Sequence, residues 1–183
     1  MDNASILAVA GVAALVGLAG CGGTSADTGG TGGIPGDKGF VEYRPAGQQY
    51  AIEVPEGWTR TETADTATFT DKLNTITVTL GSSLAAPTTA DGTAALAALA
   101  GATPGFAAGS VSTVPRRGGT ALLVTYRADA PADPVTGKIV NDDVERYEFW
   151  HDRRLLIVTL AGPYGSDNLA PWRTVTDSVR WLD

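Results

Sequence analysis

Residues Arg153–Trp181 read RRLLIVTLAGPYGSDNLAPWRTVTDSVRW, and this stretch decides the fold. Leu155–Ala161 is apolar at both odd and even positions, which is typical of a strand covered on both faces, by helices or by a helix and a loop layer. Asn168–Leu182 carries apolar residues at helical spacing. The stripe consists of Leu169, Trp172, Val175, Val179 and Leu182. The two segments predict a buried strand followed by a closing helix, with Ser166 or Asp167 as the helix cap.

The segments that precede this stretch predict a mainly β domain. Runs rich in β-branched and aromatic residues, bounded by Gly and Pro, are typical of strands. They are Phe40–Arg44, Tyr50–Val54, Thr66–Thr70, Thr75–Leu80, Val111–Val114, Thr120–Arg127 and Val144–Trp150. One helix is expected among them at Ala90–Ala100, with Asp91 as its N-cap and Gly101 as its stop. Strand runs and helices without a βαβ alternation predict an α+β fold, an antiparallel β-sheet flanked by helices.

Three pieces of the chain carry a family resemblance. They are YAIEVPEGW at Tyr50–Trp58, TALLVTYR at Thr120–Arg127, and the Arg153–Trp181 stretch. Their order resembles the Mog1/PsbP-like superfamily and, more narrowly, LpqN-type lipoproteins of high-GC Gram-positive bacteria. The resemblance covers Phe40–Asp183 and implies an α/β/α sandwich. It also implies a binding or assembly role, since PsbP attaches to a photosystem, Mog1 to a small GTPase and LpqN-type proteins to envelope partners.

The N-terminus predicts where the protein is located. Ile6–Gly20 is an uncharged run of 15 residues, which is short for a bilayer span and suits the apolar region of a signal peptide. The run ends in Leu18-Ala19-Gly20-Cys21, which resembles a bacterial lipobox. That resemblance implies cleavage before Cys21 and acylation of Cys21, so that acyl chains would anchor the protein on the extracytoplasmic face of the cell membrane. The alternative is an ordinary secretory signal in which Cys21 is incidental.

The segment after Cys21 is expected to be a tether. Eight of the 18 residues in Gly22–Gly39 are glycine, and such a composition buries too little apolar surface to offset the entropy of ordering. The chain is thus predicted to have three parts. They are a signal peptide at residues 1–20, a lipidated Cys21 with a disordered tether at 21–39, and one domain at 40–183.

Charge and composition exclude several classes of partner. The formal net charge of the 183-residue chain is −7, without the basic face that nucleic-acid binding requires. The only cysteine is the expected anchor, so no internal disulfide or cysteine nucleophile is expected. No cofactor is predicted.

No catalytic or metal-binding constellation stands out. His151 is the only histidine, so a Ser-His-Asp hydrolase would have to use it, and no Gly-x-Ser-x-Gly motif is present. The acidic segment Ala128–Glu145 lacks EF-hand spacing and is expected to be a solvated loop, with calcium as the alternative. Two arginine pairs, Arg116-Arg117 and Arg153-Arg154, would clamp an anion only if the fold brought them together.

These patterns favour a non-enzymatic lipoprotein that binds an envelope protein. The alternative is a carrier that holds a lipid or another small apolar ligand between sheet and helix. A carrier would need an oversized apolar pocket, whereas a protein-binding domain would show a filled core and an exposed apolar patch.

Overall fold

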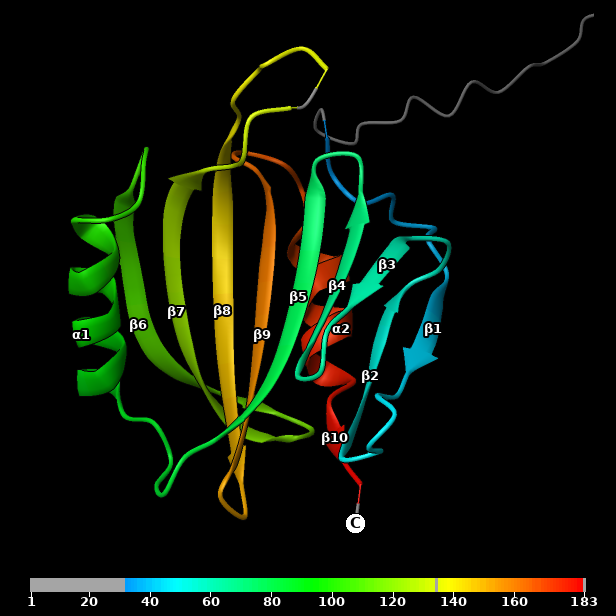
Figure 1. Ribbon diagram of the computed structural model, residues 1–183, viewed down its shortest axis with the longest axis vertical. Coiled ribbons are helices and arrows are strands. Elements are labelled where there is room, and N and C mark those ends of the chain that lie inside the picture. Colours follow the sequence, from blue (N-terminus) through cyan, green and yellow to red (C-terminus); the bar gives the residue numbers. More distant parts are fainter. Residues whose placement is uncertain (1–31, 134, 183) are drawn as a thin grey trace, which may run out of the picture.

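The computed structural model describes residues 32–133 and 135–182, which form two antiparallel sheets and two helices (Figure 1). The strands are β1 (Phe40–Tyr43), β2 (Tyr50–Pro55), β3 (Thr59–Glu62), β4 (Thr66–Asp71), β5 (Asn74–Ser82), β6 (Ala107–Arg116), β7 (Gly119–Asp129), β8 (Asn141–His151), β9 (Arg154–Pro163) and β10 (Arg180–Trp181). The helices are α1 (Thr89–Ala100) and α2 (Leu169–Asp177). One sheet has the order β3-β4-β5-β9-β8-β7-β6, and the other has the order β1-β2-β10. The α+β prediction is confirmed.

Different elements pack against the two faces of the large sheet. The face that packs against α2 and the small sheet is called the inner face here, and it holds the core. Its fully buried side chains include Ile76, Val78, Phe149, Leu156, Val158 and Leu160. On the opposite, outer face α1 packs against β6 and β7 at one edge. Figure 1 shows α1 beside β6 and α2 next to the small sheet.

Strand β9 illustrates the asymmetry between the faces. Leu156, Val158 and Leu160 are fully buried on the inner face. Leu155 and Ile157, which point to the outer face, are only half-buried because α1 covers β6 and β7 rather than β9. The apolar residues at odd and even positions of β9 therefore reflect an inner face that is fully buried and an outer face that is only partly buried.

The closing helix is shorter than its apolar stripe predicts. It ends at Asp177, and Arg180 and Trp181 then form β10 by pairing with Ala51 and Tyr50 of β2. Val179 lies beyond the end of the helix but is fully buried, so an apolar residue at helical spacing faces the core without being helical. The predicted caps are also wrong, because Asn168 occupies the N-cap position of α2.

The first helix begins one residue earlier than predicted and is capped differently. Thr88 is the N-cap, and its hydroxyl accepts a hydrogen bond from the backbone N–H of Asp91. The Asp91 carboxylate in turn accepts from the Thr88 backbone N–H at 2.7 Å, which completes a capping box. Asp91 is thus the third helical residue, and its hydrogen bonds with Thr88 lower its pKa. Gly101 ends the helix as predicted.

Residues 32–39 belong to the folded part of the chain, which corrects the expectation that the tether extends to Gly39. Ile34 is buried in the core, and its backbone N–H donates to Asn168 Oδ1 at 2.8 Å. Its burial and this hydrogen bond offset the entropy that the glycines lose on ordering. Within the described residues, no helix is long and apolar enough to cross a membrane.

Candidate functional site

The N-terminal segment enters the domain at one end of the large sheet. Asn74 Nδ2 donates to the Gly32 carbonyl at 2.7 Å, and Asn168 Nδ2 donates to Asn74 Oδ1 at 2.9 Å. The 71–74 turn, the 130–140 loop and residues 163–168 meet at the same end, because β4, β7 and β9 finish there and β5 and β8 begin there. We refer to it as the Gly32 end.

Most exposed large apolar side chains of the described residues gather at the Gly32 end. Seven such side chains are strongly exposed; four of them belong to the three segments just named, and a fifth is the first residue of α2, directly after residues 163–168. The five, called the rim here, are Leu73, Val135, Ile139, Tyr164 and Leu169, and they are 46–90 % exposed. Such a grouping is typical of a surface that contacts another molecule.

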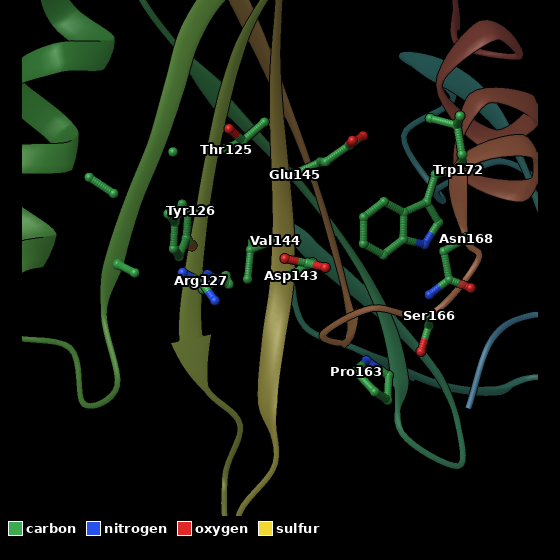
Figure 2. Close-up of a pocket in the computed structure, with 14 residues that line it drawn as sticks. Thr125, Tyr126, Arg127, Asp143, Val144, Glu145, Pro163, Ser166, Asn168 and Trp172 are labelled. Atoms are coloured by element: carbon green, nitrogen blue, oxygen red, sulfur yellow. The ribbon is translucent and has the colours of Figure 1, made fainter. Parts of the chain in front are cut away.

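A cleft of about 300 Å³ opens beside the start of α2, next to the rim. Strands β6, β7 and β8 form one wall, and residues 163–172 form the other. Its polar and aromatic lining includes Thr125, Tyr126, Arg127, Asp143, Glu145, Ser166, Asn168 and Trp172. Figure 2 shows Asp143 and Glu145 extending from β8 toward the indole of Trp172.

A hydrogen-bond network under α2 fixes the carboxylate of Glu145. The Tyr147 hydroxyl donates to Glu145 Oε2 at 2.8 Å and accepts from Arg116 at 3.2 Å. Arg116 is itself held, since its Nε donates to Thr176 Oγ1 at 3.1 Å. Burial, reinforced by the charge of Glu145, raises the pKa of Tyr147 to about 12. Tyr147 therefore keeps its proton and remains a donor to Glu145 at physiological pH.

Trp172 holds a buried polar atom that has no hydrogen-bond partner among the described residues. The side chain is only 5 % exposed, and the atom is its Nε1. A buried donor left without an acceptor costs about 1–3 kcal/mol.

Asp142, next to the cleft on the outer face of β8, is a second unsatisfied group. Its Oδ1 is buried with no partner among the described residues. Burial, with a smaller effect of the neighbouring Asp143 charge, raises the pKa of Asp142 from 3.8 to about 6. The native state therefore holds this proton at a higher pH than the unfolded chain does. The free energy of unfolding therefore falls as the pH rises from about 4 to 6, and above that range it falls no further on account of Asp142.

We expect the substitution Asp142→Asn to stabilise the protein at neutral pH. The variant should gain about 1–3 kcal/mol in free energy of unfolding at pH 7–8, since each unit of pKa shift corresponds to about 1.4 kcal/mol. The gain should vanish below pH 4, where both states are protonated. Urea unfolding between pH 4 and 8 measures it, with the exposed Asp65→Asn as the control that leaves the profile unchanged. An Asp142→Asn variant no more stable than the natural chain at pH 8 would contradict this account.

His151 lies far from the cleft, at the opposite end of the sheet. It is 44 % exposed, stacks on Trp181 at a centroid distance of 5.5 Å, and faces the Asp152 carboxylate at 3.4 Å. The structure shows no hydrogen bond between His151 and a Ser or Tyr hydroxyl in the described part of the chain. The geometry that a hydrolase would need at His151 is therefore not found there.

The other sequence candidates are spread over the molecule. Cys21 lies outside the described residues. Within residues 32–133 and 135–182, no group of three or more acidic, His or Cys side chains could hold a metal ion. In the Ala128–Glu145 segment, Asp133 instead accepts hydrogen bonds from the 135–136 turn, which lower its pKa.

The arginine pairs do not form one anion clamp. Arg116 is bound to Thr176 and Tyr147, as described above. Arg154 donates to the Leu182 carbonyl at 3.1 Å and lies over the Trp181 ring at 5.1 Å. One arginine of each pair, Arg116 and Arg154, is thus engaged with its own partners.

The architecture is similar to that of several solved structures. A cyanobacterial PsbP from Synechocystis is 13% identical, with a TM-score of 0.54, and the match covers 84% of this chain and 98% of that one. The Ran-binding protein Mog1p of Saccharomyces cerevisiae is 11% identical, with a TM-score of 0.52 and coverage of 80% and 97%. The chain has a Mog1/PsbP-like fold. A Bacteroides thetaiotaomicron protein also matches at 11% identity and a TM-score of 0.51 over 78% of this chain, which spans about half (48%) of that protein's length.

At these identities, the Mog1/PsbP-like likeness shows a shared fold. It confirms the fold that the sequence resemblance implied, whereas the narrower LpqN-type assignment stays a prediction. No protein-family model matches the chain. No curated protein matches it by sequence either.

Proposed function

We propose that this protein is a lipoprotein whose Mog1/PsbP-like domain is a non-enzymatic binding domain for a protein of the cell envelope. Acyl chains on Cys21 would hold it to the extracytoplasmic face of the cell membrane. Two or more acyl chains bind a bilayer stably, whereas a single chain binds only marginally.

This proposal is supported mainly by the position of the rim. Cys21 precedes Gly32 by 11 residues. If these residues form the tether that the sequence predicts, it would span about 17–20 Å on average and at most about 36–40 Å. An anchor at Cys21 would therefore keep the Gly32 end, with its exposed apolar rim, close to the membrane. A surface placed there suits a partner that is itself in the membrane or at its surface.

The core supports a protein-binding domain better than a carrier of apolar ligands. The space between the large sheet and α2 is filled by fully buried side chains, among them Phe149, Leu156 and Val175. The cleft beside α2 carries Asp143 and Glu145, which a lipid tail would have to desolvate. Mog1p, a Ran-binding protein, shares the fold, so this architecture accommodates protein binding in at least that case.

Photo-cross-linking in the native cells tests the proposal. Benzoylphenylalanine is introduced at Tyr164 or Leu169 of the rim and, as a control, at Leu84, which is 89 % exposed at the opposite end of the sheet. We expect the rim positions to yield one cross-linked envelope protein of defined mass and Leu84 to yield none. Equal products from all three positions, or none from any of them, would refute the proposal.

A further inference from the structure

Two connections at the Gly32 end present strongly exposed apolar side chains. Leu73 lies in the two-residue turn between β4 and β5 and is 46 % exposed. In the 130–140 loop between β7 and β8, Val135 is 90 % exposed and Ile139 is 57 % exposed. We call these three side chains the tips. In Figure 1 the loop projects beyond the strands, at the same end of the large sheet as the β4–β5 turn.

The tips are separate from the part of the rim that adjoins the cleft. Leu169 lines the cleft, whereas none of the tips does. Tyr164 is linked to the cleft through Arg127, a lining residue whose guanidinium carbon lies 4.6 Å from the centre of the Tyr164 ring. The rim therefore has two parts, one beside a concave site and one on projecting turns. Concave sites suit the side chains of a partner, whereas apolar side chains on projecting turns suit a surface without a fixed shape.

The 130–140 loop satisfies much of its own backbone. The N–H of Asp133 donates to the Lys138 carbonyl at 2.9 Å, and the N–H of Thr136 donates to Asp133 Oδ1 at 2.7 Å. In all, six backbone N–H groups donate to acceptors within the loop, those of residues 130, 133, 135, 136, 137 and 138. A backbone group that leaves water for lipid without a partner is costly. A loop that bonds to itself can approach lipid at a lower cost.

Neither connection carries a net charge. The β4–β5 turn has Asp71 beside Lys72, and the loop has Asp133 and Lys138, although the formal net charge of the whole chain is −7. The Asp133 carboxylate is directed into the loop by the hydrogen bonds just described. Both lysines are exposed and adjoin a tip in the sequence. Such pairs are typical of segments at a bilayer interface, where the lysine stem lies along apolar surface and the ammonium stays in water.

The chain that leads to Cys21 enters the domain beside one of the tips. Asn74, which follows Leu73, donates from Nδ2 to the Gly32 carbonyl at 2.7 Å. Cys21 lies 11 residues before Gly32. An acyl anchor at Cys21 would hold the tips at a high effective concentration near the bilayer. Even weak insertion of three side chains is populated under that condition.

We propose that the tips insert into the lipid interface of the membrane that holds the anchor. The domain then stands on the bilayer on its β4–β5 turn and its 130–140 loop. This inference rests on the proposed function, since acyl chains on Cys21 bring the tips to the lipid. It leaves Tyr164, Leu169 and the cleft for the protein partner.

Photo-cross-linking to lipid tests this inference. The full-length protein, with benzoylphenylalanine in place of Leu73 or Ile139, is isolated from its own membranes. It is then reconstituted in vesicles of equal parts phosphatidylcholine and phosphatidylglycerol that contain no other protein. After irradiation, we expect a chain whose mass has increased by one phospholipid. Both positions are exposed, so the substitution leaves the packed core unchanged.

Two control positions carry the same probe. Leu84 is 89 % exposed at the opposite end of the sheet. Asp167 is exposed at the Gly32 end, and its backbone adjoins Gly33, so it reports the adducts that closeness to the anchor alone produces. We expect the lipid adduct from either tip to exceed that from both controls by about fivefold or more. Equal yields from the tips and Asp167, or no lipid adduct from either tip, would overturn the proposal.

The same spectra separate this inference from the proposed function, because they also report the acyl groups on Cys21. An acylated chain whose tips give no lipid adduct would refute the inference and leave the proposed function standing. Tips that cross-link in native cells to an envelope protein in place of lipid would also refute it, and would support the proposed function. A chain without acyl groups would end the lipoprotein proposal and this inference together.

Discussion

Replacing Phe149 with alanine is expected to lower the free energy of unfolding by about 3–5 kcal/mol. Phe149 lies on the inner face of β8, fully buried between Ala121 of β7 and Leu156 of β9. Its ring also stacks against Tyr147 at a centroid distance of 6.4 Å. The central strands are held on both sides by backbone pairing, so they cannot collapse into the cavity that the truncation leaves.

Urea unfolding measures the effect of Phe149→Ala as a lower midpoint with an unchanged slope. Leu84→Ala is a suitable control, because Leu84 is strongly exposed and its truncation should change the stability by less than about 0.5 kcal/mol. A loss below about 1 kcal/mol for Phe149→Ala would mean that the space between sheet and α2 is not tightly packed. That result would reopen the carrier hypothesis.

The substitution Cys21→Ala is expected to transfer the protein from the membrane fraction to the soluble fraction almost completely. Each buried CH₂ of an acyl chain contributes about 0.8 kcal/mol, so loss of all chains removes the whole anchoring energy. Fractionation followed by a denatured mass measurement checks this prediction, since the natural chain should carry the mass of two or three acyl groups. The variant should unfold at the same urea concentration, because the substitution changes no residue of the core described above. A natural chain of unmodified mass, or a variant that stays in the membrane, would contradict the lipoprotein proposal.

Much of the sheet could be predicted because long strands carry their own pattern. The alternation of Ile76, Val78 and Leu80 with threonines predicted β5, since one face of that strand is buried and the other is half-exposed. The segments Thr120–Arg127 and Val144–Trp150 were both expected to be strands, and in the structure they pair antiparallel.

Short and exposed elements gave no such signal. All four residues of β3 are exposed, so no alternation marks Thr59–Glu62 as a strand. Strand β10 has two residues and forms only because β2 offers it an edge. The cap of α1 is a different case, because Thr88 and Asp91 have the spacing of a capping box, and this spacing marks the start of the helix in the sequence.

The cleft could be predicted only in part. The residues 143 and 145 are acidic where 147 and 149 of the same strand face are aromatic, which indicates that the inner face becomes polar at one end. The sequence alone predicts a solvated loop for the acidic residues and places Trp172 on the apolar stripe of the closing helix. Their meeting depends on the register of β7 and β8 and on where α2 packs, and such long-range contacts leave no local pattern in the sequence.

Native mass spectrometry of the full-length protein, extracted from its own membranes in mild detergent, tests the central claim most directly. The account predicts an acylated chain together with one envelope protein at fixed stoichiometry. A chain that carries a small apolar ligand in place of a protein, or that remains alone under every extraction condition, would contradict it.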